Sequence, residues 1–182
     1  MAEVIGITPR EFANIYFQFN HLVNTGKLKS WDEFDKLLLE KLGKPEKLET
    51  LAEMRDKFEG SWEEMDERML ELIKNLRQGG YKVGLLSNAT RASGGRLREL
   101  GLTKYFDVFM ISAEQGLQKP EPELFKRFAG ELGVELKELI YIDDAESSLR
   151  TANELGYQPI LFRGYEELLS ELLKLGIELE SN

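Results

Sequence analysis

The sequence predicts an α/β fold in which a parallel sheet carries helices on both faces. From residue 80 onward, short apolar segments alternate with amphipathic helical segments. The apolar segments are leucine-rich, β-branched or aromatic, which is typical of strands buried on both faces of a parallel sheet. Four of them are predicted strands, at residues 81–86, 106–111, 139–142 and 159–162. The helices between them end in a repeated Glu-Leu-Gly, at residues 99–101, 131–133 and 154–156, where glycine commonly ends a helix.

The first 60 residues have a different pattern, with helix starts but no convincing strand. Thr8–Glu11 and Ser30–Glu33 are capping boxes, in which a side chain at each end of the box hydrogen-bonds the helix terminus. Amphipathic runs follow both boxes. We therefore predict two domains, a small helical subdomain at residues 1–60 and an α/β core at residues 61–182.

Two segments lie near the ends of these predicted domains. Ser61–Glu64 is a third capping box, and it predicts a longer helix that runs from there through Met65 to the glycines after residue 78. Glu3–Ile7 is open to two interpretations. It is either a short strand or, because Gly6 interrupts it just before a capping box, a loop that flanks the first helix.

The composition excludes several kinds of partner and site. With 33 acidic and 24 basic residues the formal charge is −9, which disfavours nucleic acid and an anionic membrane surface as partners. The absence of cysteine excludes disulfides, thiolate metal sites and a cysteine nucleophile. No apolar run approaches the ~20 residues that span a bilayer, and no signal-peptide core follows Met1. We therefore expect a cytoplasmic protein.

Polar residues follow two of the predicted strands. Ser87 and Asn88 come after the first strand, and Asp143 and Asp144 come after the third. Because functional groups gather at the carboxyl ends of parallel strands, we expect these side chains at one edge of the sheet. Taken alone, the first pair also fits a turn that caps a helix, and one of the two acids also fits a helix cap near Ala145. Two adjacent carboxylates suit a hard cation, with Mg²⁺ the natural candidate.

A lysine just before two closely spaced prolines completes this cluster. Pro120 restricts Lys119 to an extended conformation just before a predicted helix. A lone lysine is usually a solvated surface residue. Beside a serine, an asparagine and two acids, it predicts a site for a phosphoryl group and its metal ion. His21 is expected to be a surface or packing residue. For Arg91 and Arg96, a solvated helix face is favoured over contact with an anion.

Three motifs in this order resemble motifs two, three and four of the haloacid dehalogenase-like (HAD-like) hydrolases. They are Leu85–Thr90, Gln118–Pro122 with Phe125, and Tyr141–Asp144. The resemblance covers roughly residues 60–176. It implies a Rossmann-like, three-layer parallel sheet, and the helical segment before residue 60 resembles the family's helical cap.

The resemblance also implies roles for the residues of these motifs. Ser87 matches the residue that hydrogen-bonds the transferred phosphoryl group, and Asn88 lies beside it. Lys119 matches the lysine that neutralises the phosphoryl group and the nucleophile. Asp144 aligns best with the acidic Mg²⁺ ligand, with Asp143 as the adjacent candidate. The implied function is a Mg²⁺-dependent phosphatase of small phosphorylated molecules, and dehalogenation fits less well because the lysine and acids suit phosphoryl charge.

The sequence departs from the family pattern at the first motif. That motif is an apolar strand ending in Asp-x-Asp, whose first aspartate is the nucleophile, but only Met1 and Ala2 precede Glu3. The other aspartates lie in polar helix faces or, for Asp107, at the start of a strand. Ser148 is a minor departure, since many relatives carry asparagine or aspartate there. We therefore expect a truncated chain that lacks the first core strand and its nucleophile, and that is inactive alone.

Three functional classes remain. The first is the phosphatase whose first strand is absent here, and the second is a non-catalytic HAD-like binding or interaction module. The third, a receiver-type signalling domain, is disfavoured because receivers place the acid pair first and the lysine last. A missing central strand leaves backbone groups unpaired on its neighbours. The chain can close this gap, insert Glu3–Ile7, or pair with another copy, and we expect a homodimer.

Overall fold

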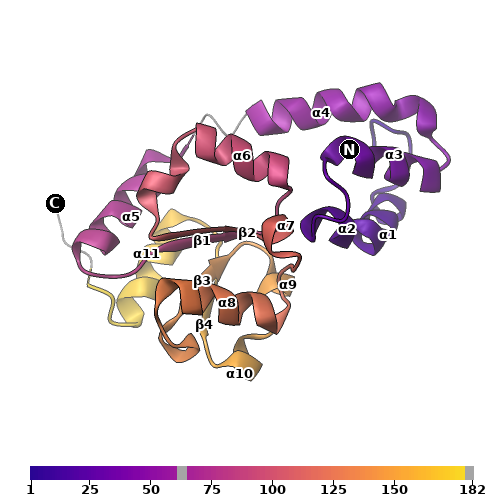
Figure 1. Cartoon of the computed structure of the whole chain (residues 1–182). Helices are drawn as coiled ribbons and strands as arrows, with labels where there is room; N and C mark the ends of the chain where they lie inside the picture. Colours follow the sequence, from indigo (N-terminus) through magenta and orange to yellow (C-terminus); the bar gives the residue numbers. More distant parts are fainter. Residues whose placement is uncertain (61–64, 179–182) are drawn as a thin grey trace. The chain divides into compact units, whose positions relative to one another are not determined.

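The computed structural model describes residues 1–60 and 65–178 (Figure 1). Its first elements, with η for a 3₁₀ helix, are α1 Pro9–Phe19, α2 His21–Asn24, α3 Trp31–Lys41, η1 Pro45–Lys47, α4 Leu48–Gly60, α5 Glu67–Gln78, β1 Gly84–Ser87, α6 Arg91–Glu99 and η3 Leu102–Tyr105. The later elements are β2 Val108–Ile111, α7 Ser112–Gln115, α8 Pro122–Leu132, η4 Leu136–Glu138, β3 Ile140–Asp143, α9 Glu146–Leu149, α10 Ala152–Leu155, β4 Gln158–Leu161 and α11 Tyr165–Lys174. None of the described helices combines the length and the apolar character needed to cross a membrane.

The chain packs as two compact units. Among the described residues, the first unit holds those before residue 61 together with Asn88–Leu100 and Ile111–Gln118. The second holds Met65–Ser87, Gly101–Met110 and the described residues from Lys119 onward. The first unit therefore includes two segments from beyond residue 60. The division into domains at that residue stays a prediction.

The first unit is built on a helical core of its own. Its fully buried side chains come from the N-terminal segment and from α2, α3 and α4, and are Ile5, Val23, Phe34, Leu38, Leu39 and Leu51. Glu3–Ile7 forms turns that place Ile5 in this core, so its interpretation as a strand is wrong. The loop interpretation is confirmed, because Thr8 and Glu11 form a reciprocal capping box that starts α1 directly after it.

The strands form two separate pairs. β3 pairs with β4 in parallel, with Ile140 opposite Gln158 and Asp143 opposite Leu161. β1 pairs with β2, and in the described part of the chain no strand pairing joins β1 to β3. The predicted α/β class with parallel strands is confirmed. The edges of β1 and β3 that do not face their partners have no neighbouring strand in the described part of the chain.

The strand positions and helix ends match the sequence closely. Each strand overlaps its predicted segment, and its ends differ from the predicted ends by at most three residues. The glycines of the three repeated tripeptides, Gly101, Gly133 and Gly156, all have the left-handed conformation that ends a helix. Local sequence patterns are therefore sufficient to locate the strands and the helix stops.

The start of α5 differs from the prediction. The predicted capping box at residues 61–64 lies outside the described residues. α5 begins at Glu67, because the Asp66 side chain accepts a hydrogen bond from the backbone amide of Arg68 and caps the helix there. Met65 therefore precedes the helix and is not part of its apolar face.

Candidate functional site

A buried ion pair lies at the carboxyl end of β3. The Lys119 Nζ donates to Asp143 Oδ2 at 2.5 Å, and the two side chains are 9% and 6% exposed. The same ammonium donates to the backbone carbonyl of Leu86, in β1, at 3.3 Å. The Lys119–Pro120 peptide bond is cis. Charges this deeply buried are retained only when they are paired and hydrogen-bonded, so the lysine is fixed in place by its partners.

Tyr141 supports this pair from within β3. Its hydroxyl lies 3.1 Å from the Leu86 carbonyl and 3.2 Å from Asp143 Oδ2, and it can donate to either oxygen. The ring packs edge-on against Phe125, with Tyr157 nearby. Burial raises the pKa of Tyr141 well above its ordinary value, and the Asp143 carboxylate raises it further. The phenol therefore stays neutral and acts only as a hydrogen-bonding group.

The two adjacent acids have different surroundings. Both oxygens of Asp143 are bonded, since Oδ1 accepts a hydrogen bond from the Ala145 amide at 2.8 Å and Oδ2 accepts from Lys119. Asp144 is exposed. The helix α9, whose N-cap residue is Ala145, has no side-chain cap, so the predicted capping role is wrong for both acids. Asp143 bonds the amide of the N-cap residue itself, and Asp144 is not needed for this bond or for the bond to Lys119.

These carboxylates fit Mg²⁺ only as an incomplete set of ligands. Among the described residues, no group of three or more histidine, cysteine, aspartate or glutamate side chains is placed to hold a metal ion. Mg²⁺ often keeps several waters and binds through one or two carboxylates together with substrate phosphate. The exposed carboxylate of Asp144 suits that kind of site, with Asp143 as its neighbour.

Ser87 and Asn88 follow directly on the strand that carries the Leu86 carbonyl. Ser87 is the last residue of β1, and Asn88 is the next residue in the chain. The following helix, α6, is capped by Thr90, whose side chain accepts a hydrogen bond from the Ser93 amide. Since another residue caps α6, helix capping does not explain the serine and the asparagine.

The structure brings only part of the predicted cluster into direct contact. Lys119 bonds Asp143, and through Leu86 it contacts the strand that ends in Ser87. The convergence of Ser87, Asn88, Asp144 and a bound ligand stays a prediction. Tyr141 was missed, although an aromatic residue two positions before an acid in a strand shares its face and offers a signal.

The surface residues behave as expected. His21 is in the short helix α2, with Nδ1 3.1 Å from the Gln18 carbonyl oxygen in an exposed position. Arg96 lies 3.7 Å from Glu99 on the exposed side of α6. Arg91 is exposed.

The site and the strand order agree with a known enzyme family. The sequence model of the haloacid dehalogenase-like hydrolase family matches residues 2–156. The chain belongs to the haloacid dehalogenase-like hydrolases. The predicted HAD-like α/β fold is thereby confirmed, and solved structures of this family, described below, have the same fold.

Curated relatives of this HAD-like chain include phosphatases of small molecules. It is 32% identical over 140 residues to D-ribitol-5-phosphate phosphatase of Bacteroides thetaiotaomicron. The matched region covers 73% of this chain and 66% of that protein. It is 30% identical over 97 residues to glyceraldehyde 3-phosphate phosphatase of Methanopyrus kandleri, across 52% of this chain and 42% of that protein. Bifunctional epoxide hydrolase 2 of Sus scrofa is 30% identical across 61% of this chain, which spans only 21% of that protein. The chain thus spans a limited part of these relatives.

Two solved structures illustrate the shared fold. A HAD family enzyme from Bacteroides thetaiotaomicron, crystallised as a mutant with magnesium and inorganic phosphate, is 25% identical and has a TM-score of 0.60. The similarity covers 87% of this chain and 88% of that chain. A predicted HAD-like hydrolase from Porphyromonas gingivalis has a TM-score of 0.63 at 20% identity, across 94% of this chain and 91% of that chain. The second likeness concerns the fold alone.

Proposed function

We propose that this chain forms the phosphoryl-binding site of a Mg²⁺-dependent phosphatase of small phosphorylated molecules. The buried Lys119–Asp143 pair at the carboxyl end of β3, bonded to the strand that ends in Ser87, carries the proposal. A fixed ammonium is suited to neutralise a phosphoryl oxygen in a water-poor site. Relatives named as phosphatases of ribitol 5-phosphate and glyceraldehyde 3-phosphate support the substrate class.

Each residue has a distinct task in this proposal. The Lys119 ammonium keeps its short bond to Asp143 and exchanges its longer bond to the Leu86 carbonyl for one to a phosphoryl oxygen. The Ser87 hydroxyl donates to a second phosphoryl oxygen, and Asn88 adds a polar contact beside it. Asp144, with Asp143 next to it, holds Mg²⁺. The bound ion supplies further neutralisation of phosphate charge.

We further propose that the chain binds phosphate but does not turn over substrate alone. A covalent nucleophile needs a carboxylate oxygen that can reach phosphorus. Both oxygens of Asp143 are engaged, and the strands β1, β2 and β4 end in Ser87, Ile111 and Leu161. The same observation supports the alternative function, a non-catalytic HAD-like binding or interaction module.

Calorimetric titration with inorganic phosphate in the presence of Mg²⁺ tests the site. We expect Lys119→Ala to weaken phosphate binding by about tenfold or more, since a charged hydrogen bond is worth roughly 1.5–3 kcal/mol. Lys126→Ala is the matched control, because that lysine is exposed in α8 and should leave binding unchanged. Equal phosphate affinity of the parent and Lys119→Ala would contradict the site.

An aryl-phosphate assay with Mg²⁺ separates the enzyme from the binding module. We expect no turnover by the purified chain. Turnover that Lys119→Ala abolishes would keep the site and refute the lack of activity. Turnover that survives this substitution would place the reaction elsewhere in the protein.

A further inference from the structure

A buried ion pair in the first unit has no part in the proposed function. Arg55 of α4 donates from Nε and Nη2 to the two carboxylate oxygens of Asp35 in α3, each at 2.5 Å. The two side chains are 11% and 1% exposed. Because burial of two charges often costs as much free energy as their attraction returns, stability alone does not account for this pair. The next contact of its cation suggests a further role.

That contact is the indole of Trp31, the first residue of α3. The Arg55 guanidinium lies 4.0 Å from the centroid of the indole ring. Phe34 packs edge-on against the same ring, with the two centroids 5.7 Å apart. The indole Nε1 donates a hydrogen bond to the Ser93 hydroxyl oxygen at 3.3 Å, across 62 positions of sequence. The helical core therefore fixes the ring, while its N–H bonds a residue of α6.

Ser93 connects the indole to the start of α6. It is 2% exposed, and Thr90, the N-cap residue of α6, is fully buried. The Thr90 side-chain oxygen accepts a hydrogen bond from the Ser93 amide at 3.0 Å, and the two hydroxyl oxygens lie 2.9 Å apart. Because the Ser93 hydroxyl accepts from the indole, it is suited to donate to Thr90. The chain of bonds from Trp31 thus ends two residues after Asn88.

The turn between β1 and α6, at residues 88–90, is also bonded to α7. The Ala89 amide donates to the Ser112 hydroxyl oxygen at 3.1 Å, and the Ala113 amide donates to the Ala89 carbonyl at 3.4 Å. The segment between α2 and α3 contacts the same place, since a Cβ atom on Gly26 would lie 2.5 Å from the Ala113 carbonyl oxygen. All of these residues belong to the first unit. The helical residues before position 61 therefore hold the turn through both α6 and α7.

We propose that Trp31 is a positioning residue for the turn at residues 88–90. The inference rests on the proposed function, because this turn carries Asn88 of the proposed phosphoryl site. In this role Trp31 acts through Ser93 and Thr90 and makes no contact with the phosphoryl group. A displaced turn weakens phosphate binding, since hydrogen bonds weaken steeply as their geometry departs from the optimum. The indole N–H thereby contributes to phosphate affinity from outside the site.

Amide hydrogen exchange of the full chain without phosphate tests the position of the turn. Trp31→Phe removes the indole N–H and keeps an aromatic ring against the Arg55 guanidinium. We expect the Ala89 amide to exchange about threefold to tenfold faster in this variant, as the loss of one supporting hydrogen bond implies. Thr8→Ala, which removes the cap of α1 in the same unit, controls for a general loss of stability. Equal exchange of Ala89 in the parent and Trp31→Phe, or equally fast exchange in the two variants, would overturn the proposal.

Calorimetric titration with inorganic phosphate and Mg²⁺ tests the link to the site. We expect Trp31→Phe and Ser93→Ala each to weaken phosphate binding by about threefold or more, and Thr8→Ala to leave it unchanged. The double variant of Trp31 and Ser93 should bind no more weakly than the weaker single variant, because both substitutions break the same hydrogen bond. Phosphate affinity that Trp31→Phe leaves unchanged, or losses that add in the double variant, would contradict the positioning role.

The two measurements separate this inference from the proposed function. If the parent and Lys119→Ala bind phosphate equally, the phosphoryl site fails, and the exchange of Ala89 still decides whether Trp31 positions the turn. If Lys119→Ala loses phosphate binding while Trp31→Phe keeps it, the site stands and the positioning role fails.

Discussion

Asp143 and Asp144 are adjacent in the chain but occupy opposite environments. The first is buried and fully bonded, and the second is exposed. In a strand that ends between them, neighbouring side chains point to opposite sides. Exposure leaves the second carboxylate available for a cation, whereas the first has a structural task as the partner of Lys119.

The exposed acid should control Mg²⁺ affinity. We expect Asp144→Asn to weaken Mg²⁺ binding by about threefold to tenfold, because the ion loses one charged ligand but keeps its waters. Calorimetric titration of the parent and the variant with Mg²⁺ measures this. Glu146→Gln, which removes an exposed charge two residues further on, is the control. Equal affinities for the parent and Asp144→Asn would remove this residue from the site.

The buried acid should control stability. Asp143→Asn leaves the Lys119 ammonium without its charged partner in a buried position, so we expect a loss of about 3 kcal/mol in the free energy of unfolding. Urea unfolding of this variant, compared with Asp144→Asn, checks the expectation. Similar stability of the two variants would show that the ion pair contributes little.

The carboxylate of Asp107 makes the stability of the protein depend on pH. The hydrogen bond from Arg77 lowers the pKa of Asp107, and the bond from the Val83 amide lowers it further. A lowered pKa in the folded state means that the ionised form stabilises the fold above the unfolded pKa of about 3.9. This stabilisation is lost as the pH falls through the lower, folded-state pKa.

We therefore expect the free energy of unfolding to fall less for Asp107→Asn than for the parent when the pH is lowered from about 6 to about 3. Urea unfolding at both pH values measures the difference. Glu123→Gln, an exposed residue in α8, corrects for the loss of one negative charge. An identical pH dependence of the parent and Asp107→Asn would argue against this contribution.

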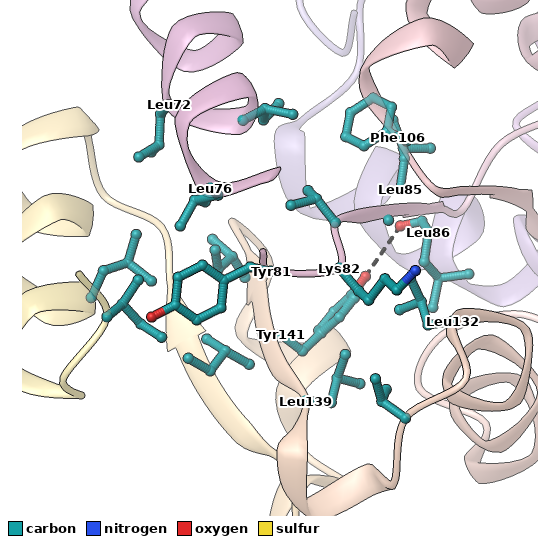
Figure 2. A pocket seen from close by; sticks show the side chains of 18 of the residues that line it. Leu72, Leu76, Tyr81, Lys82, Leu85, Leu86, Phe106, Leu132, Leu139 and Tyr141 are labelled. Carbon is teal, nitrogen blue, oxygen red and sulfur yellow. Dashed lines mark hydrogen bonds between the residues drawn. The ribbon is translucent and has the colours of Figure 1, made fainter. Parts of the chain in front are cut away.

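At the scale of secondary structure elements, the glycine Gly84 of β1 packs closely against α8. A Cβ atom on Gly84 would lie 2.6 Å from the Cζ of Phe128 and 3.2 Å from the Cδ2 of Leu132. Phe128 and Leu132 both line an apolar cavity of about 600 Å³ in the second unit, part of whose lining Figure 2 shows. The strand can therefore pack against α8 only because this position has no side chain.

We expect Gly84→Ala to lower the free energy of unfolding by about 1 kcal/mol, since the cavity gives Phe128 some room to move. Gly130→Ala in α8 is the matched control. Nothing lies within 4 Å of the Cβ that it adds, so it should stabilise the helix by about 0.5–1 kcal/mol. Thermal unfolding of both variants decides whether the contact with Phe128 is as tight as described.

At the scale of the whole molecule, the two unjoined strand pairs create exposed edges. Such edges favour association with other copies. We expect association that depends on protein concentration, as in the homodimer expected from the sequence. Static light scattering over a range of protein concentrations measures this. A monomer at every concentration would contradict the expectation.

Local patterns in the sequence are enough to predict much of this protein. The strand positions, the glycine helix stops, the Thr8 capping box and the family all follow from hydrophobic periodicity, turn chemistry and motif order. These signals depend on residues close together in the chain. The positions of Lys119 and of the acid pair belong to the same class of information.

Other features required the tertiary structure. The choice of Asp143 over Asp144 as the partner of Lys119, the role of Tyr141, and the separation of the strands into two pairs all involve residues far apart in sequence. A hydrogen bond from Tyr141 to Leu86 joins positions 55 residues apart. Because burial and long-range contacts decide which side chain faces which partner, neither pattern nor propensity along the chain determines them.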